Sequence, residues 1–133
     1  MTEKVRTKAR PRSPHLTIYR WSITMAMSIG HRITGIALYF GMIFLALWLV
    51  ALACGGDIFN TVNGIYGSLP GLCLLFLYTL AGVHHMVGSI RHIVLDMNPC
   101  LLAKEQATLI AWATVFISLI LTIAIWIIGY SVI

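Results

Sequence analysis

The sequence predicts an all-α integral membrane protein, with three transmembrane helices preceded by a basic N-terminal tail and a short interfacial helix. Of the 133 residues, 59% are apolar and only 10% are charged, whereas about a quarter of a soluble domain is charged. Three long stretches contain no Lys, Arg, Asp or Glu at all: 33–54, 65–90 and 106–133. Because this composition leaves too little polar surface to face water on every side, it excludes a soluble enzyme and a disordered chain. The length indicates one membrane-anchor domain over 1–133.

The first element is a basic tail over 1–20. Lys and Arg outnumber Asp and Glu by nine to four, and seven of the nine basic residues precede residue 33. A basic tail can bind nucleic acid, but basic residues beside an apolar span are typical of the segment that stays on the cytoplasmic or matrix side. We therefore interpret the tail as a topology signal and expect no nucleic-acid partner.

Residues 21–54 predict a helix that starts at the membrane interface and continues into the first span. The start, 21–32, is mixed in polarity. The following 22 residues, 33–54, would cover about 33 Å, which is enough for a hydrocarbon core of about 30 Å. Residues 55–64 are rich in Gly and Asn and predict a loop.

The second span is predicted over 65–96 and the third over 106–130. Asn98–Pro99 ends the second span, because the residue before a proline avoids helical backbone angles.

The distribution of basic residues also predicts the orientation. The first loop carries no Lys or Arg, whereas the connection between the second and third spans carries Lys104. We therefore expect the N-terminus and the 96–106 connection to face the cytoplasm or matrix, with Asp57 and the C-terminus on the opposite side. Because the polar segment 11–21 separates the basic residues from the first apolar run, we expect neither a secretory signal nor a transit peptide. This favours a bacterial inner (cytoplasmic) membrane over a mitochondrial one.

A polar cluster lies at the end of the second span and comprises His84, His85, Arg91, His92 and Asp96. At about 100° per residue, His85, His92 and Asp96 share one helix face. A neutral imidazole inside the bilayer is a good axial ligand for haem iron, and His92 and Arg91 are placed to pair with haem propionates. The alternative is a histidine hydrogen-bonded to a neighbouring helix.

A second polar cluster lies at the start of the first span. Ser28, Arg32 and Gly35 are four and three residues apart and therefore form one stripe on a helix. The guanidinium of Arg32 and the hydroxyl of Ser28 could hold the carbonyl of a quinone headgroup. Beside them, His31 is a further candidate partner for haem propionates. The alternative is that Arg32 extends to lipid phosphates.

Three motifs resemble the cytochrome b membrane-anchor subunits of succinate dehydrogenase (respiratory complex II): SPHLTIYRW at 13–21, SIGHRITG at 28–35 and HHMVGSIRHIVLD at 84–96. The resemblance covers essentially the whole chain. It implies a non-catalytic subunit that shares one haem b with a second three-helix anchor subunit. It also implies docking of an iron–sulfur subunit and a flavoprotein subunit, whose electrons reach ubiquinone or menaquinone.

The resemblance also implies roles for single residues. The family's haem ligand lies six residues before the Arg of the RH pair, which corresponds to His85 as the axial ligand of the iron, with Arg91 and His92 as the pair. His84 is the neighbouring alternative. The family's GIRH pattern reads GSIRH here, so that Gly88 stands one position early.

The same resemblance places Ser28 and Arg32 at the quinone, His31 near the haem propionates, and Asp96 beside the quinone pocket on a route for protons. Two alternatives stay open at the level of the sequence. One is a structural anchor without a cofactor, which the adjacent His84 and His85 disfavour. The other is the anchor of a fumarate reductase, which would work in the opposite direction.

Overall fold

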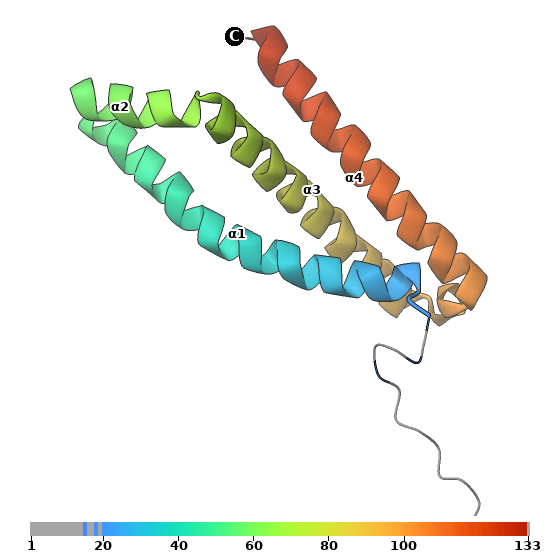
Figure 1. The fold of residues 1–133 in the computed structure, drawn as a ribbon. Helices are drawn as coiled ribbons and strands as arrows, with labels where there is room; N and C mark the ends of the chain where they lie inside the picture. Colours follow the sequence, from blue (N-terminus) through green and yellow to red (C-terminus); the bar gives the residue numbers. More distant parts are fainter. Residues whose placement is uncertain (1–14, 16–17, 19, 133) are drawn as a thin grey trace, which may run out of the picture.

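The computed structural model describes residue 15, residue 18 and residues 20–132, so most of the predicted basic tail lies outside the described residues. The elements follow in the order α1 (Ile23–Cys54), α2 (Gly56–Tyr66), α3 (Leu69–Met97), the short 3₁₀ helix η1 (Pro99–Leu102) and α4 (Lys104–Val132) (Figure 1). Three helices, α1, α3 and α4, are long and apolar enough to cross a membrane. The prediction of an all-α protein with three spans is therefore confirmed.

Helix α3 lies at the centre of the arrangement and packs against both α4 and α1. Figure 1 shows that α1 and α3 converge toward the end of the molecule where the chain enters α1, and that α2 connects them at the opposite end. The polar residues of both helices therefore come together where α1 begins and α3 ends.

The predicted interfacial start and the first span form one continuous helix, α1. Its 32 residues would extend about 48 Å, which exceeds the hydrocarbon core by several turns. The hydroxyl of Ser22 caps its start by accepting a hydrogen bond from the backbone N–H of Met25, at 3.3 Å.

The prediction of a loop over 55–64 is wrong, because most of this segment is the helix α2. Gly55 and Gly56 have positive φ angles of 65° and 58°, a region that glycine enters without steric cost, and they make the bend between α1 and α2. The Tyr66 hydroxyl then donates a hydrogen bond to the Phe44 carbonyl of α1, at 2.8 Å. Tertiary contacts of this kind outweigh the weak helix propensity of Gly and Asn.

The second long helix starts four residues later than the predicted 65–96, because residues 65 and 66 belong to α2. Helix α3 begins after Ser68, whose hydroxyl accepts a hydrogen bond from the Gly71 N–H at 3.3 Å. It ends at Met97, directly before Asn98–Pro99. Helix α4 extends a few residues beyond the predicted 106–130 at both ends.

Helix α4 contributes a buried stripe of small residues: Ala111, Thr114, Ser118 and Thr122. The three hydroxyls donate to backbone carbonyls four residues earlier, at 2.7–2.9 Å. These side chains are therefore small and internally satisfied, which allows close approach of helices in a membrane. Large apolar side chains of the spans, such as Phe40, Ile36 and Ile120, are in contrast more than half exposed and suit a lipid or partner-subunit environment.

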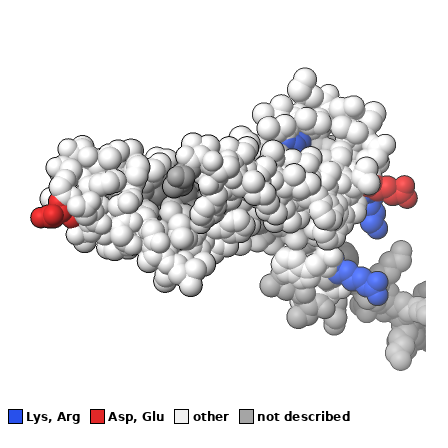
Figure 2. All heavy atoms as spheres, turned by 90° about the horizontal axis from the view of Figure 1, so that it is seen from above, with Lys and Arg blue, Asp and Glu red and all other residues white. Residues whose placement is uncertain are grey.

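The charged side chains of the described part lie at the ends of the molecule. Figure 2 shows Lys and Arg toward the end where the tail emerges, with acidic atoms beside them and further acidic atoms at the opposite end. Asp57 lies in the first turn of α2. On the face that Figure 2 shows, the long middle of the molecule is largely uncharged, as a membrane-spanning region requires.

We predict that Tyr66→Phe loosens α2 without disturbing the spans. Loss of one hydrogen bond costs about 1 kcal/mol, which corresponds to roughly fivefold faster opening. Hydrogen–deuterium exchange of the purified membrane assembly would measure this as roughly fivefold faster exchange of α2 amides. Tyr39→Phe is the matched control, because Tyr39 is exposed on α1. Unchanged exchange in Tyr66→Phe would contradict the anchoring of α2 by this bond.

Candidate functional site

Three histidine rings meet where α1 and α3 converge. The rings of His31 (α1) and His85 (α3) are stacked, with their centroids 4.0 Å apart and an angle of 15° between their planes. The ring of His92 meets His31 edge-on at 5.2 Å. His85 and His92 therefore both contact the same ring on α1, as their spacing on one helix face predicts.

Two glycines make room for these rings. A Cβ atom at Gly88 would lie 2.8 Å from Cδ2 of His31, and a Cβ at Gly35 would lie 3.1 Å from Cε1 of His85. Each helix thus presents a glycine to the histidine of the other helix. We call this reciprocal contact of His31, Gly88, His85 and Gly35 the histidine interlock.

A tyrosine ring of α3 also packs against a glycine of α1, further along the helix pair. The Tyr78 ring of α3 occupies the space where a Cβ of Gly41 would lie. The Tyr78 hydroxyl donates to the Leu38 carbonyl at 3.3 Å. The helices α1 and α3 are therefore joined by rings that pack onto glycine backbone, which requires a close and specific rotation of each helix.

Hydrogen bonds fix the orientation of the His85 ring. Its Nδ1 lies 3.1 Å from the His31 carbonyl oxygen and 3.2 Å from the Thr34 hydroxyl. Because a carbonyl oxygen can only accept, Nδ1 carries the hydrogen and Nε2 keeps its lone pair. In the neutral form of His85 this tautomer leaves Nε2 as the nitrogen that can act as a ligand.

His31 has the opposite arrangement of ring nitrogens. Its Nε2 lies 3.1 Å from the Ser89 hydroxyl, whose own hydrogen is donated to the His85 carbonyl at 2.9 Å. The Ser89 oxygen therefore accepts from His31 Nε2–H, which leaves the lone pair of His31 on Nδ1. The two stacked rings consequently differ in which nitrogen is free.

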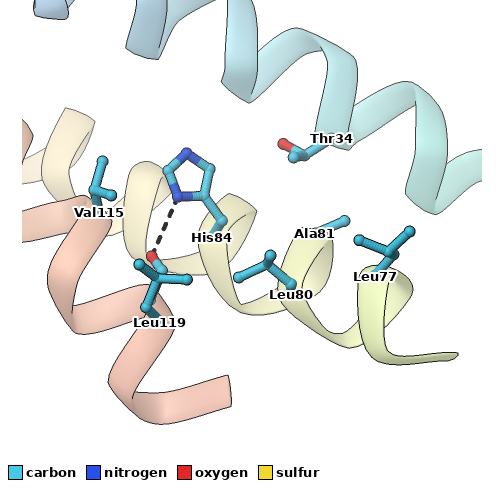
Figure 3. Close-up of a pocket in the computed structure, with 8 residues that line it drawn as sticks. Thr34, Leu77, Leu80, Ala81, His84, Val115 and Leu119 are labelled. Atoms are coloured by element: carbon cyan, nitrogen blue, oxygen red, sulfur yellow. Dashed lines mark hydrogen bonds between the residues drawn. The ribbon is translucent and has the colours of Figure 1, made fainter. Parts of the chain in front are cut away.

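His84 faces away from the histidine interlock, toward α4. Its Nδ1 lies 3.2 Å from the Ser118 hydroxyl. Figure 3 shows this bond at the edge of a cavity of about 300 Å³ between α3, α4 and Thr34 of α1. The other lining side chains are apolar: Leu77, Leu80, Ala81, Val115 and Leu119. The Nδ1 of His84 thus bonds to α4, whereas the Nδ1 of His85 bonds to α1. The Nε2 of His84 lies near α1, 3.9 Å from the position of a Cβ at Gly30.

The two charged residues of the polar cluster on α3, Arg91 and Asp96, lie in different environments. Arg91 is only 7% exposed, and its Nε has no hydrogen-bond partner in the part of the chain that the structure describes. A buried guanidinium N–H without an acceptor is costly, so this group suits an anion from outside the chain. Asp96 is exposed near the end of α3, and no hydrogen bond joins it to the histidines within residues 20–132.

The predicted quinone pair, Ser28 and Arg32, lies close to the histidine interlock. Within the described part of the chain, the two side chains are not hydrogen-bonded to each other. Ser28 is half-buried and Arg32 is exposed, one helical turn apart on α1. No hydrogen bond connects their side chains among the described residues, so both remain available to an external carbonyl. Arg32 also directly follows His31 in the chain, so the predicted quinone pair and the histidines occupy the same third of the molecule.

The sequence reasoning missed three hydroxyls of this region: Thr34, Ser89 and Ser118. Ser89 is four residues after His85, and Thr34 is three residues after His31. Helical spacing therefore indicates their bonds to the carbonyls of their own helices, but not the rings that they contact on the other helix. Ser118 is 34 residues from His84, and only the packing of α4 on α3 reveals it.

Comparison with known proteins adds the following findings. The profile of the family described as "Succinate dehydrogenase/Fumarate reductase transmembrane subunit" matches residues 6–125. The chain is 34% identical to the succinate dehydrogenase cytochrome b556 subunit of Rickettsia bellii over 118 residues, which cover 89% of this chain and 91% of the relative. It is 39% identical to the mitochondrial succinate dehydrogenase cytochrome b560 subunit of Sus scrofa over 93 residues, covering 67% and 54%. The cytochrome b556 subunit of Paracoccus denitrificans is 34% identical over 87 residues, covering 65% and 67%.

We predict that Gly88→Ala disrupts the histidine interlock. The added methyl group would lie 2.8 Å from His31 Cδ2, and overpacking of this kind costs about 1–3 kcal/mol. The thermal midpoint of the purified assembly should therefore fall.

Gly82→Ala is the matched control on the same helix, because its Cβ would meet Leu38 at an ordinary 3.6 Å. If Gly88→Ala and Gly82→Ala melted at the same temperature, the close approach of His31 to Gly88 would be refuted.

Proposed function

Because this chain belongs to the family of succinate dehydrogenase/fumarate reductase transmembrane subunits, we propose that it is the membrane-anchor cytochrome b subunit of a succinate:quinone oxidoreductase. In this proposal it holds haem b together with a second anchor subunit and helps to form the site where quinone is reduced. The electrons come from succinate through the flavoprotein and iron–sulfur subunits. The chain itself carries out no succinate chemistry.

The observation that carries the proposal is the state of His85. Its Nδ1–H donates to the His31 carbonyl at 3.1 Å, so its Nε2 would be the atom that holds the haem iron. A ligating histidine whose other nitrogen is hydrogen-bonded to a backbone carbonyl is the usual arrangement at metal centres. When bound, haem b supplies a one-electron redox centre.

Further residues of the site would suit a haem. The unpaired Nε–H of buried Arg91 would donate to a propionate carboxylate, with His31 and His92 close by. No cluster of three or more His, Cys, Asp or Glu side chains within the described ranges could hold a bare metal ion. A haem, in contrast, requires only one axial ligand from this chain, and we propose that the second comes from the partner anchor.

For the quinone, we propose that Ser28 and Arg32 donate hydrogen bonds to one carbonyl oxygen. The reduction consumes two electrons and two protons, and negative charge develops on this oxygen before protonation. Donors that are already in place stabilise such charge without reorganising. Exposed Asp96 is then suited to pass protons from the aqueous side toward the quinone.

The arrangement of charges supports a location in the inner (cytoplasmic) membrane. The described Lys and Arg lie toward the end where the tail emerges, opposite Asp57 (Figure 2). We propose that this basic end faces the cytoplasm, following the bias of basic residues toward that side, and that the iron–sulfur and flavoprotein subunits dock there. The relatives named above are called succinate dehydrogenase subunits, which favours this direction over fumarate reduction.

We predict that His85→Ala removes most of the b-type haem signal in a dithionite-reduced minus oxidised spectrum of the purified complex. The reason is the loss of the Nε2 ligand. His84→Ala is the matched control and should retain the haem, because His84 bonds to Ser118 on another helix. A normal spectrum in His85→Ala with loss in His84→Ala would move the ligand to His84.

We predict that Arg32→Leu lowers succinate–quinone reductase activity roughly 100-fold, as expected for removal of a preorganised donor. Succinate oxidation by an artificial acceptor should persist, because that acceptor takes electrons from the soluble subunits. Arg20→Leu tests for a general effect of losing positive charge at the same end and should leave quinone reduction near normal. Quinone turnover at the normal rate in Arg32→Leu would refute its role.

A further inference from the structure

The Thr34 hydroxyl is committed to accepting a hydrogen bond from His85. Its single hydrogen is donated to the His31 carbonyl at 2.9 Å. Toward His85 Nδ1, at 3.2 Å, the Thr34 oxygen can therefore act only as an acceptor. The Nδ1–H of His85 is thus shared between two acceptors, the His31 carbonyl and the Thr34 hydroxyl.

Ser118 makes the equivalent bond to His84. Its hydrogen is donated to the Thr114 carbonyl at 2.7 Å, so its oxygen accepts from His84 Nδ1–H at 3.2 Å. Both adjacent histidines therefore carry their hydrogen on Nδ1 and keep a lone pair on Nε2. The two hydroxyls come from different helices, since Thr34 belongs to α1 and Ser118 to α4.

We propose that Thr34 is a positioning residue for the haem ligand, and that it acts by accepting the Nδ1–H of His85. This inference rests on the proposed function, because it requires His85 to bind the iron. The His31 carbonyl fixes the tautomer. The Thr34 hydroxyl helps to keep the ring in one rotation and increases the electron density at Nε2. The β-branched Thr34 is itself held by the bond to His31, which fixes its side-chain torsion.

Residues next to Thr34 on α1 complete the contact with His85. It is half-buried, and the following residue, Gly35, provides the space against which the His85 ring lies. One helical turn thus supplies the hydroxyl from Thr34, the carbonyl from His31 and the gap from Gly35.

Thr34→Val in the full complex tests the proposal. Valine keeps the shape but removes one of the two acceptors of the His85 Nδ1–H and leaves the His31 carbonyl, so Nε2 becomes a weaker electron donor. The haem midpoint potential should then rise, because the ferric state loses stabilisation. Haem transfer to excess apomyoglobin should become about tenfold faster, in line with the loss of a hydrogen-bond partner of a metal ligand. Thr34→Ser should restore both values.

Two control variants separate the proposed role from general packing. Thr79→Val removes a hydroxyl that bonds only to the Leu75 carbonyl of its own helix, at 2.8 Å, and should change neither value. Ser118→Ala removes the acceptor of His84 and should likewise leave the haem unchanged. If Thr34→Val fails to assemble, Thr34→Ala removes the same acceptor with a smaller side chain and carries the same expectation.

The outcomes distinguish this inference from the function on which it rests. Normal potential and normal haem transfer in an assembled Thr34→Val or Thr34→Ala variant would overturn the inference while the haem assignment stands. Altered values in Ser118→Ala alone would also overturn it, and would assign the ligand to His84. A wild-type complex without a haem spectrum would overturn the proposed function itself.

Discussion

The histidine interlock is the contact on which both the fold and the site depend. His31 lies over Gly88 and His85 over Gly35, so each helix must present a glycine where the other presents a ring. Apolar side chains offer little specificity inside a membrane, because lipid tails are equally apolar. The rotation of α1 relative to α3 is therefore determined by steric fit and hydrogen bonds, and the same rotation stacks the two imidazoles at 4.0 Å.

Burial of polar rings in an apolar bundle imposes a second constraint, since each ring N–H needs an acceptor. The chain meets it with hydroxyls that donate to backbone carbonyls of their own helices and accept from a histidine of another helix. Thr34, Ser89 and Ser118 all follow this scheme. Each ring N–H of His31, His84 and His85 can therefore find an acceptor while the ring is neutral. A neutral imidazole is the form that suits an iron ligand.

The sequence predicted the spans well because length, lack of charge and a terminating proline act locally. It did not predict α2, although apolar residues recur there at helical spacing over 58–66, because Gly and Asn weigh against a helix. Within the site, the common face of His85 and His92 followed from helix geometry alone. The partners Thr34 and Ser118 did not, because contacts between helices depend on the rotation of each helix, which no single span encodes.

The described residues leave several groups of the site without an internal partner, and these groups share one region. Arg91 buries an Nε–H without an acceptor among them, His85 keeps its Nε2 lone pair, and exposed Arg32 follows His31 directly. An unpaired buried guanidinium lowers the stability of the isolated chain. A ligand that binds only the folded chain would offset this cost. In the proposed function, haem and the partner anchor supply these missing contacts, so assembly of the site and stability of the subunit are expected to be coupled.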